Sequence, residues 1–261
     1  MIKGKLYLVP SPLDHGCEDL TPLDGVLPQE TMTQASNLVH WISENAKSTR
    51  AFLKRVDAFA PLAHPLQTLQ ITELPREVHK KGDHAGTRSP QFDPRPLLKP
   101  ALDGLNIGLI SEAGMPGVAD PGSSVVRAAH ELEIEVVPLI GPVSILLALA
   151  ASGLNGQNFA FMGYLPQDPT ARVQRIRELE AFARKTGQTQ LFIETPYRNR
   201  ALLQALLETL REDIRLTMAC GLTLQNGTIR TRTASQWKRG EAAATATAEL
   251  LKLPCVFAIG L

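Results

Sequence analysis

Runs of consecutive apolar residues recur along the first half of the chain, separated by stretches of mixed polarity. The runs are short and rich in β-branched or aromatic residues, which is typical of strands buried in a sheet. The candidate strands lie at 6–9, 38–42, 67–74, 107–110 and 135–139. The first one ends in Pro10-Ser11-Pro12, so we expect its carboxyl end to open into a loop.

The stretch between the last two of these runs predicts a helix. Its apolar residues recur at helical spacing and are Val125, Val126, Ala129 and Leu132. Asp120 followed by Pro121 predicts an N-cap and a proline at the first helical position. A helix between two strands of one sheet predicts parallel pairing with a right-handed crossover.

Two more helices are predicted in this half from their apolar positions. Phe52, Leu53 and Val56 share one face of a helix at about 47–56. A helix at 143–152 is apolar on nearly all sides, so we expect it to be buried throughout. The stretch 75–100 is dense in proline, glycine, histidine and charge, which predicts a long loop.

Beyond Gly153 the predicted helices become longer and more charged, which indicates a second structural unit. The candidate helices lie at 168–185 and 202–210, and the candidate strands at 190–194, 214–220, 228–231 and 255–259. An alanine-rich segment at 242–248 is the one stretch of biased composition. We therefore predict two α/β lobes, residues 1–155 and 156–261.

Composition describes a globular protein without a strong overall charge. The chain has 261 residues, of which 44% are hydrophobic, and 27 Lys+Arg against 26 Asp+Glu give a net charge of +1. Any contact with RNA must therefore be a local patch. Cys17, Cys220 and Cys255 contain no Cys-x-x-Cys pair, so neither a disulfide framework nor a zinc site is indicated. With no stretch of signal-peptide or membrane-spanning length, we expect a cytoplasmic protein in a reducing compartment, with no membrane partner.

Several common catalytic motifs are missing from the sequence. No Gly-x-Gly-x-x-Gly follows a strand and no Gly-x-x-x-x-Gly-Lys-Ser/Thr is present, which argues against a dinucleotide fold and a phosphate-binding P-loop. Neither Gly-x-Ser-x-Gly nor His-Glu-x-x-His occurs. The hydrolase and metalloprotease classes therefore lose support.

The remaining candidate chemistry lies in loops that follow predicted strands. These loops combine small residues, prolines and one or two polar groups, and they lie at 10–13, 111–122, 141–145 and 193–197. Loops at the carboxyl ends of strands are where α/β proteins bind ligands, and such loops can line a neutral pocket for an adenosine. By spacing alone, tight turns of an ordinary α/β fold are the favoured explanation.

The residues in these loops resemble the tetrapyrrole-methylase superfamily. The resemblance is carried by Ser-Glu-Ala-Gly-Met-Pro-Gly-Val-Ala-Asp-Pro-Gly at 111–122 and Val-Val-Pro-Leu-Ile-Gly-Pro-Val-Ser at 136–144. It continues in Ala-Ser-Gly-Leu at 151–154, Gly-Tyr-Leu-Pro at 163–166 and Phe-Ile-Glu-Thr-Pro-Tyr-Arg at 192–198. Within the superfamily it looks most like the branch that methylates the cytidine ribose 2'-hydroxyl of small-subunit ribosomal RNA.

The resemblance implies a fold, a cofactor and a set of binding residues. The fold would be two αβα lobes with mainly parallel or mixed sheets, with S-adenosylmethionine in the inter-lobe cleft, and the protein would be a homodimer. Carried over by position, the cofactor contacts would be Pro12, Leu13, Met115, Pro116, Val118, Ser144, Ile145, Ile193, Ala219 and Pro254. Met115 stands where the porphyrin-precursor branch has Asp, which favours the ribosomal branch.

Two departures from that branch leave the methyl acceptor open. The first loop reads Ser-Pro-Leu-Asp-His-Gly-Cys-Glu-Asp where the RNA methylase has Gly-Asn, and Met-Ala-Cys-Gly-Leu-Thr near Cys220 replaces a pattern with Arg-Glu. Besides an O-methyltransferase acting on ribosomal RNA, two alternatives therefore stand. One is a methylase of this fold with a tetrapyrrole-like small-molecule acceptor, and the other is a protein that binds S-adenosylmethionine without turnover.

Methyl transfer from a sulfonium is a direct displacement, so positioning is the main requirement and a base is needed only for a hydroxyl acceptor. Glu44, Glu112, Asp120 and Glu194 are the candidate proton acceptors. We favour Glu44 and Glu194 as catalytic candidates, since each follows an apolar strand, although a surface ion pair fits both equally well. For Asp120 the helix cap is the preferred interpretation.

Other charged residues were weighed as binding groups. Arg172, Arg175, Arg177, Arg184 and Lys185 on one helix, with Arg198 and Arg200, can follow a phosphate backbone, but a solvated helix face is the commoner explanation. His79 and His84 lie in the long loop, where nothing fixes a ligand geometry, so no metal is expected.

Overall fold

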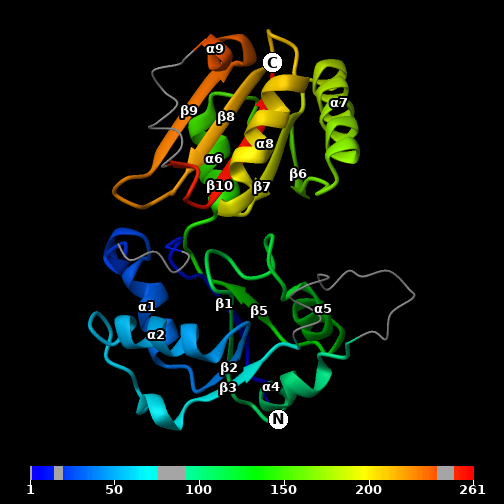
Figure 1. Ribbon diagram of the computed structural model, residues 1–261. Helices are drawn as coiled ribbons and strands as arrows, with labels where there is room; N and C mark the ends of the chain where they lie inside the picture. The colour runs from blue at the N-terminus through cyan, green and yellow to red at the C-terminus, as the bar shows by residue number, and fades with distance from the viewer. Residues whose placement is uncertain (1, 15–19, 76–91, 240–249) are drawn as a thin grey trace. The chain divides into compact units, whose positions relative to one another are not determined.

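The chain forms two compact units, which we describe one at a time (Figure 1). The computed structural model describes residues 2–14, 20–75, 92–239 and 250–261. Unit 1 spans Met1–Val143 and unit 2 spans Ser144–Leu261. The sequence placed the boundary after residue 155; the units divide earlier because the helix that starts at Ser144 packs on strands of unit 2.

Unit 1 is built on a five-stranded sheet in which every pairing is parallel. Its strands are β1 (Leu6–Val9), β2 (His40–Ser43), β3 (Gln70–Glu73), β4 (Ile107–Ile110) and β5 (Val136–Pro138). They lie in the order β3-β2-β4-β1-β5, so β1 and β4 are central neighbours although a hundred residues separate them. The predicted parallel β-α-β unit is confirmed, with β4 and β5 both paired to β1.

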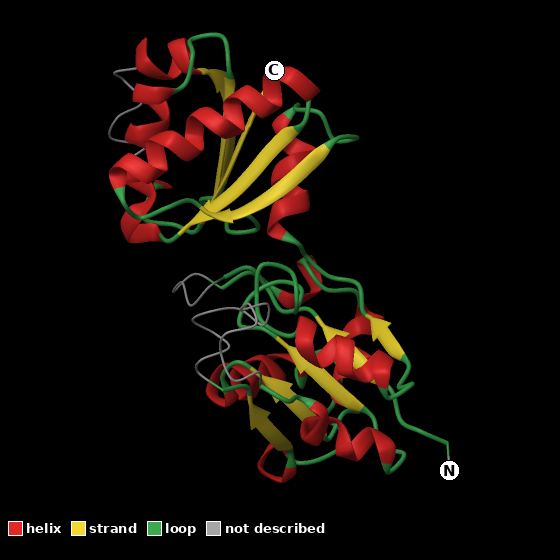
Figure 2. Cartoon of the chain, turned by 90° about the vertical axis from the view of Figure 1, so that its right-hand side faces the viewer, coloured by secondary structure: helices red, strands yellow, loops and turns green. Residues whose placement is uncertain are grey.

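Helices cover both faces of the unit 1 sheet (Figure 2). They are η1 (Leu23–Gly25), α1 (Gln29–Ser36), α2 (Ala46–Val56), η2 (Leu66–Thr68), η3 (Arg95–Leu98), α4 (Lys99–Leu102) and α5 (Ser123–Glu131). Apolar residues of α1 and α2 pack with Trp41 on one face, and those of η3, α4 and α5 pack with Ile42 on the other. Alternate residues of a strand point to opposite faces, so β2 contributes to both cores.

Gly108 allows the centre of this sheet to close around a tryptophan. A Cβ atom at Gly108 would lie 2.7 Å from ring carbons of Trp41, closer than two carbon atoms approach. Trp41 is 1% exposed and donates its indole N–H to the Leu38 carbonyl at 3.2 Å. The glycine therefore makes room for the largest side chain of the core in which α1 and α2 pack.

Unit 2 has a mixed sheet in the order β6-β7-β10-β8-β9. Its strands are β6 (Phe159–Tyr164), β7 (Thr189–Glu194), β8 (Arg215–Cys220), β9 (Thr228–Thr233) and β10 (Cys255–Gly260). β6 and β7 pair in parallel, and the other neighbours pair antiparallel. β6 was missed in the sequence, where its residues were assigned to the boundary between lobes.

The unit 2 sheet has α6 (Ser144–Ser152) on one face and α7 (Pro169–Thr186), α8 (Pro196–Thr209) and α9 (Ala234–Arg239) on the other. Figure 1 shows α6 and α8 on opposite sides of the strands. Asp168 caps α7 by accepting from the Ala171 amide at 2.8 Å, and Gly187 ends that helix in the left-handed conformation.

Three expectations from the sequence are wrong in detail. α5 begins at Ser123 with Gly122 as its N-cap and no side-chain capping bond, so Asp120 is not the cap. On α6, only one face packs on its sheet, and Leu146 is 49% exposed. Cys220 and Cys255 form a disulfide, because antiparallel pairing of β8 with β10 sets them directly opposite each other. Because the two cysteines are 35 positions apart in the sequence, the sequence pattern did not indicate that they are neighbours.

Some expectations fall on residues that are not described. These are most of the predicted loop at 75–100, with His79 and His84, as well as Cys17 and the alanine-rich segment 242–248. In the described residues, no helix combines the length and the apolar character that crossing a membrane requires. The same residues contain no group of three His, Cys, Asp or Glu side chains arranged to hold a metal ion.

Candidate functional site

The loops after β1 and β4 meet at the carboxyl edge of the unit 1 sheet. Ser11 and Gly114 exchange two backbone hydrogen bonds, at 2.9 and 3.0 Å, and so form an isolated antiparallel bridge. Gly114 has a φ of 78°, a conformation that favours glycine. The Ser11 hydroxyl also donates to the Ser111 carbonyl at 3.0 Å. Because β1 and β4 are central neighbours, their loops are brought together where α/β sheets usually bind ligands.

This bridge brings the predicted cofactor residues of unit 1 into one cluster. Pro12 and Leu13 follow Ser11 and are buried, while Met115 and Pro116 follow Gly114. A Cβ atom at Gly114 would lie 3.2 Å from a methyl carbon of Leu13, so these two loops are in close contact. Val118, whose amide donates to the Met115 carbonyl at 3.2 Å, is 40% exposed.

Three carboxylates lie at the same edge of this sheet. Glu44 follows β2, and its Oε2 accepts a hydrogen bond of 2.9 Å from the backbone amide of Glu112, in the loop after β4. Asp120 is half-buried in that loop. Burial, followed by the charges of Glu44 and Glu112, raises the pKa of the Asp120 carboxyl to about 7. Asp120 is therefore able to hold or release a proton near neutral pH.

Two buried hydroxyls beside these loops have no hydrogen-bond partner among the described residues. They are Ser43 Oγ, at the end of β2, and Ser111 Oγ, directly after β4. Buried polar atoms in native proteins are nearly always paired, with protein, water or ligand. The edge of the sheet therefore retains hydrogen-bonding capacity beside the loops that carry the cofactor candidates.

The predicted cofactor residues of unit 2 also converge. Ile193 of β7 and Ala219 of β8 are both paired with Val256 on the strand between them, so the three share one level of the sheet. Ile145, in the first turn of α6, belongs to the same apolar cluster, and Ser144 precedes it. The Pro254 carbonyl accepts from the Gly221 amide at 2.9 Å, which fixes the proline beside the end of β8.

Glu194, the second catalytic candidate, is held in a buried ion pair. Its Oε1 lies 2.7 Å from a terminal nitrogen of Arg198, and it also accepts from the Thr195 amide at 2.7 Å. The Glu194 side chain is 3% exposed. The guanidinium of Arg198 lies 5.4 Å from the ring centroid of Tyr197 and 6.0 Å from that of Tyr164. Tyr197 is 81% exposed, so the cluster ends in an accessible aromatic ring.

Three of the arginines considered for RNA binding, Arg175, Arg184 and Arg198, are paired with acidic side chains. On α7, Arg175 lies 3.2 Å from Glu178, and Arg184 lies 2.8 Å from Asp213. These pairs agree with a solvated helix face. The altered first loop is also tied down, because Asp14 forms an ion pair of 2.7 Å with Arg55 of α2.

Sequence reasoning missed two features of these sites. The first is the raised pKa of Asp120. It depends on burial and on two carboxylates that follow different strands, neither of which can be inferred from the Asp-Pro pair alone. The second is the orphaned pair of serine hydroxyls. Their positions directly after apolar strand runs were the available signal for both serines, but small polar residues at strand ends are too common to single out.

Comparison with known proteins decides the family. The model of the Tetrapyrrole (Corrin/Porphyrin) Methylases matches residues 46–237, about three quarters of the chain. The chain belongs to this family. The match spans both units and includes most of the loops that carry the resemblance in the sequence.

Relatives of this tetrapyrrole methylase carry the name ribosomal RNA small subunit methyltransferase I. The protein from Synechocystis is 34% identical over 84% of this chain and 67% of its own length. The protein from Halalkalibacterium halodurans is 30% identical over 78% of the chain and 60% of its length, and that from Vibrio cholerae is 37% identical over 49% and 43%. The chain thus spans about two fifths to two thirds of these relatives.

Solved structures share the fold at low sequence identity. The methyltransferase CobJ has a TM-score of 0.57 at 16% identity, covering 98% of this chain and 94% of CobJ. A uroporphyrin-III C-methyltransferase from Thermus thermophilus, in complex with S-adenyl homocysteine, has a TM-score of 0.52 at 17% identity, covering 98% and 97%. The predicted α/β fold with mainly parallel or mixed sheets is therefore confirmed, and one of the two sheets is parallel and the other mixed.

Proposed function

We propose that this tetrapyrrole methylase is an S-adenosylmethionine-dependent O-methyltransferase whose acceptor is a ribose 2'-hydroxyl of small-subunit ribosomal RNA. The observation that carries the proposal is the convergence of the cofactor candidates at strand-end clusters in each unit. Leu13 meets Gly114 in unit 1, and Ile193 and Ala219 share a level with Val256 in unit 2. The name of the relatives supports the choice of acceptor.

The residues at the unit 1 edge fit such a cofactor. Pro12, Leu13 and Met115 offer apolar and backbone contacts of the kind that hold an adenosine, and the unpaired hydroxyls of Ser43 and Ser111 add hydrogen-bonding capacity. The carboxylates nearby favour a cationic ligand by simple Coulomb attraction. When bound, the cofactor supplies an electrophilic methyl group on a positively charged sulfur.

We infer that Asp120 is the first candidate for the proton acceptor, with Glu44 and Glu194 as the alternatives. A group whose pKa lies near the working pH is the most effective base, and the pKa of Asp120 is raised to about 7. Glu44 holds the backbone of the loop that contains Asp120. Glu194 is already engaged, because its Oε1 forms an ion pair with Arg198 and accepts from the Thr195 amide.

We further propose a homodimer, as the family resemblance implies, and a cytoplasmic location. The disulfide between Cys220 and Cys255 argues against a cytoplasmic location, because disulfides are rare in a reducing cytosol. Size-exclusion chromatography with light scattering tests the dimer. Cell fractionation combined with thiol labelling tests the location.

The first experiment measures cofactor binding and transfer separately. Calorimetric titration with S-adenosylmethionine and S-adenosylhomocysteine is expected to show saturable one-site binding of both. Small ribosomal subunits from cells lacking the protein are then incubated with radiolabelled cofactor, and 2'-O-methylcytidine is quantified by mass spectrometry. Binding with transfer to a porphyrin precursor instead of RNA would support the small-molecule alternative, and binding with no transfer would support a protein without turnover.

Three single variants then separate the base candidates. We expect Asp120→Asn to lower kcat at least 100-fold with little change in cofactor affinity, since general base catalysis contributes about 10²–10⁴-fold. In the wild type, kcat/KM should rise with pH through an apparent pKa near 7. Glu44→Gln and Glu194→Gln serve as matched controls. A loss of kcat confined to either of these would move the base to that residue.

A further inference from the structure

The edge strand β9 carries arginines on one face and anchoring residues on the other. Arg230 is paired with Met218 and Arg232 with Leu216, so both arginines lie on the face covered by α8 and α9. Residues on the opposite face are fixed. Ile229 packs against the core that contains α6, and the Thr231 hydroxyl bonds to the Thr217 hydroxyl and the Ser152 carbonyl, both at 2.7 Å. The alternation of the strand therefore places its two cations side by side on a rigid support.

Arg232 is held in place by an aromatic ring. Its guanidinium carbon lies 5.4 Å from the ring centroid of Trp237 on α9. Trp237 is 7% exposed and donates its indole N–H to the Leu216 carbonyl at 2.9 Å. Stacking orients a guanidinium while leaving its N–H groups available at the edge of the plane. Less side-chain entropy is then lost when Arg232 binds an anion.

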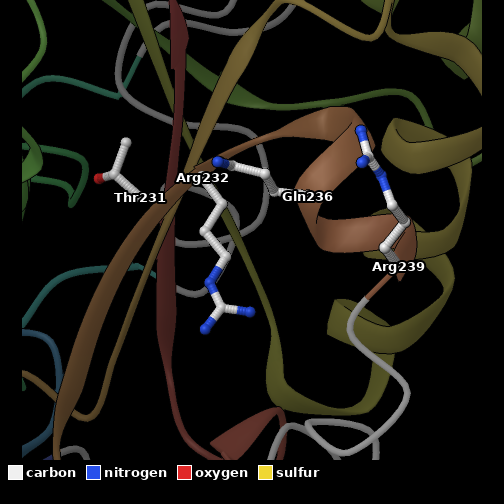
Figure 3. A pocket seen from close by; sticks show the side chains of 4 residues that line it. All are labelled: Thr231, Arg232, Gln236 and Arg239. Carbon is white, nitrogen blue, oxygen red and sulfur yellow. The ribbon is translucent and has the colours of Figure 1, made fainter.

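α9 extends this basic surface beyond the strand. Lys238 and Arg239 are exposed in its last turn. An open hollow of about 550 Å³ lies between strand and helix, lined by Thr231, Arg232, Gln236 and Arg239 (Figure 3). Figure 3 shows Arg232 extending from β9, Arg239 from α9, and the Gln236 side chain reaching from α9 toward β9.

Unlike Arg175 and Arg184 of α7, these cations have no ion-pair partner among the described residues. Within residues 2–14, 20–75, 92–239 and 250–261, no carboxylate lies within ion-pair distance of Arg230, Arg232, Lys238 or Arg239. On α7, by contrast, Arg175 and Arg184 are neutralised by Glu178 and Asp213. With a net charge of +1 for the whole chain, the positive charge of β9 and α9 is a local feature.

We propose that β9 and α9 form a docking surface for the phosphate backbone of an RNA strand. Successive residues on one side of a strand lie about 7 Å apart, so Arg230 and Arg232 can each meet a different phosphate. The cations of α9 continue the row beyond the hollow, whereas a small free anion would need donors converging on one point. The proposal rests on the proposed function for its ligand, because it places the RNA of the methyl-transfer reaction on a surface of unit 2.

The test is the affinity for a fluorescently labelled 20-nucleotide RNA, measured by anisotropy at several salt concentrations. We expect Arg230→Gln with Arg232→Gln to weaken binding at least tenfold near 100 mM salt. The slope of log K against log salt should fall by roughly 1.4–1.8, since each phosphate contact contributes about 0.7–0.9. Arg177→Gln with Lys185→Gln is the matched control, because it removes two exposed α7 cations for which no ion pair is found among the described residues. It should change the affinity less than twofold.

Two further measurements separate docking from folding and from the proposed function. Arg230→Lys with Arg232→Lys keeps the charge and should retain most of the affinity, while thermal unfolding checks each variant for folding. Calorimetry should show unchanged cofactor affinity in all variants. The docking surface would be overturned if the α7 control weakened RNA binding equally, or if the Gln variant bound RNA with wild-type affinity. If RNA binding depends on β9 but no methyl transfer occurs, only the proposed function would be overturned. Binding of an acidic protein but not of RNA would also overturn the docking surface.

Discussion

Glu44 and Glu112 join the ends of two neighbouring strands through a single hydrogen bond. Oε2 of Glu44 accepts from the Glu112 backbone amide at 2.9 Å, so the loop after β4 is held by a carboxylate that follows β2. Burial, followed by the charges of the same two carboxylates, raises the pKa of Asp120, which follows in that loop. The carboxylate that positions the loop therefore also contributes to the raised pKa of the half-buried acid within it.

The raised pKa of Asp120 predicts that unit 1 loses stability as the pH rises. Below about pH 4 the carboxyl is protonated in both the folded and unfolded chain; above it the unfolded chain ionises while the folded one retains its proton up to about pH 7. The contribution of Asp120 is therefore fully present at low pH and lost between about pH 4 and 7. Because the side chain is half-buried, we expect a loss of about 1–3 kcal/mol.

Urea unfolding of wild type and Asp120→Asn at pH 5 and pH 8 measures this effect. The variant should be more stable relative to wild type at pH 8 than at pH 5, because the amide does not ionise. Asp24→Asn, an exposed acid on η1, is the control and should show the same pH dependence as wild type. If the difference between Asp120→Asn and wild type does not change with pH, the carboxyl titrates at its ordinary value.

The ion pair between Glu194 and Arg198 predicts a marked loss of stability when one partner is neutralised. Glu194→Gln leaves the Arg198 charge, whose side chain is 21% exposed, without its partner. Removing one member of a buried pair costs about 3–5 kcal/mol, and the partial exposure of Arg198 reduces the expected cost to about 1–3 kcal/mol. Glu178→Gln breaks the exposed pair with Arg175 and should have no measurable effect. Denaturant unfolding at 0.1 M salt compares the two; equal stabilities would contradict the prediction.

The disulfide between Cys220 and Cys255 predicts a stability that depends on reductant. The bond joins residues 35 positions apart, and the chain-entropy model gives about 3–4 kcal/mol for a loop of that length. Addition of dithiothreitol, or Cys220→Ser with Cys255→Ser, should lower the midpoint of urea unfolding by similar amounts. Alkylation followed by mass spectrometry should modify Cys17 alone in protein purified without reductant. Three modified thiols would show that the two cysteines are reduced.

The sequence predicted the strands of both sheets well because buried strands are marked by their own apolar residues. β1, β4 and β10 lie where their apolar runs are, and α7 begins at Pro169 with Asp168 as its N-cap, as the capping signal indicated. β6 was missed because Phe159–Tyr164 contains a glycine and no β-branched residue, although three of its six residues are aromatic. The local sequence pattern was therefore enough to locate an element whose own residues form an apolar run or a capping motif.

Contacts between elements that are distant in the sequence could not be predicted from the local pattern. The apposition of Cys220 and Cys255 depends on a register between β8 and β10 that no local feature specifies. The exposure of Leu146 on α6 likewise depends on which face of the helix meets the sheet. The cofactor candidates were placed by resemblance, and their clustering within each unit follows from strand order, a property of the whole sheet.

Asn199 predicts a link between the packing of α8 and cofactor affinity. It is fully buried, and its amide donates to the Leu251 and Leu253 carbonyls at 3.0 and 2.8 Å, which holds the segment leading into Pro254. Asn199→Ala leaves two carbonyls without a donor and should reduce the free energy of unfolding by about 2–4 kcal/mol. Because Pro254 is a predicted cofactor contact, we also expect at least fivefold weaker binding of S-adenosylhomocysteine by calorimetry, below the unfolding temperature. As the control, Asn37→Ala removes an exposed amide from the end of α1 and should change neither the free energy of unfolding nor the cofactor affinity. If Asn199→Ala destabilises the protein but leaves the cofactor affinity unaltered, Pro254 is not part of the cofactor site.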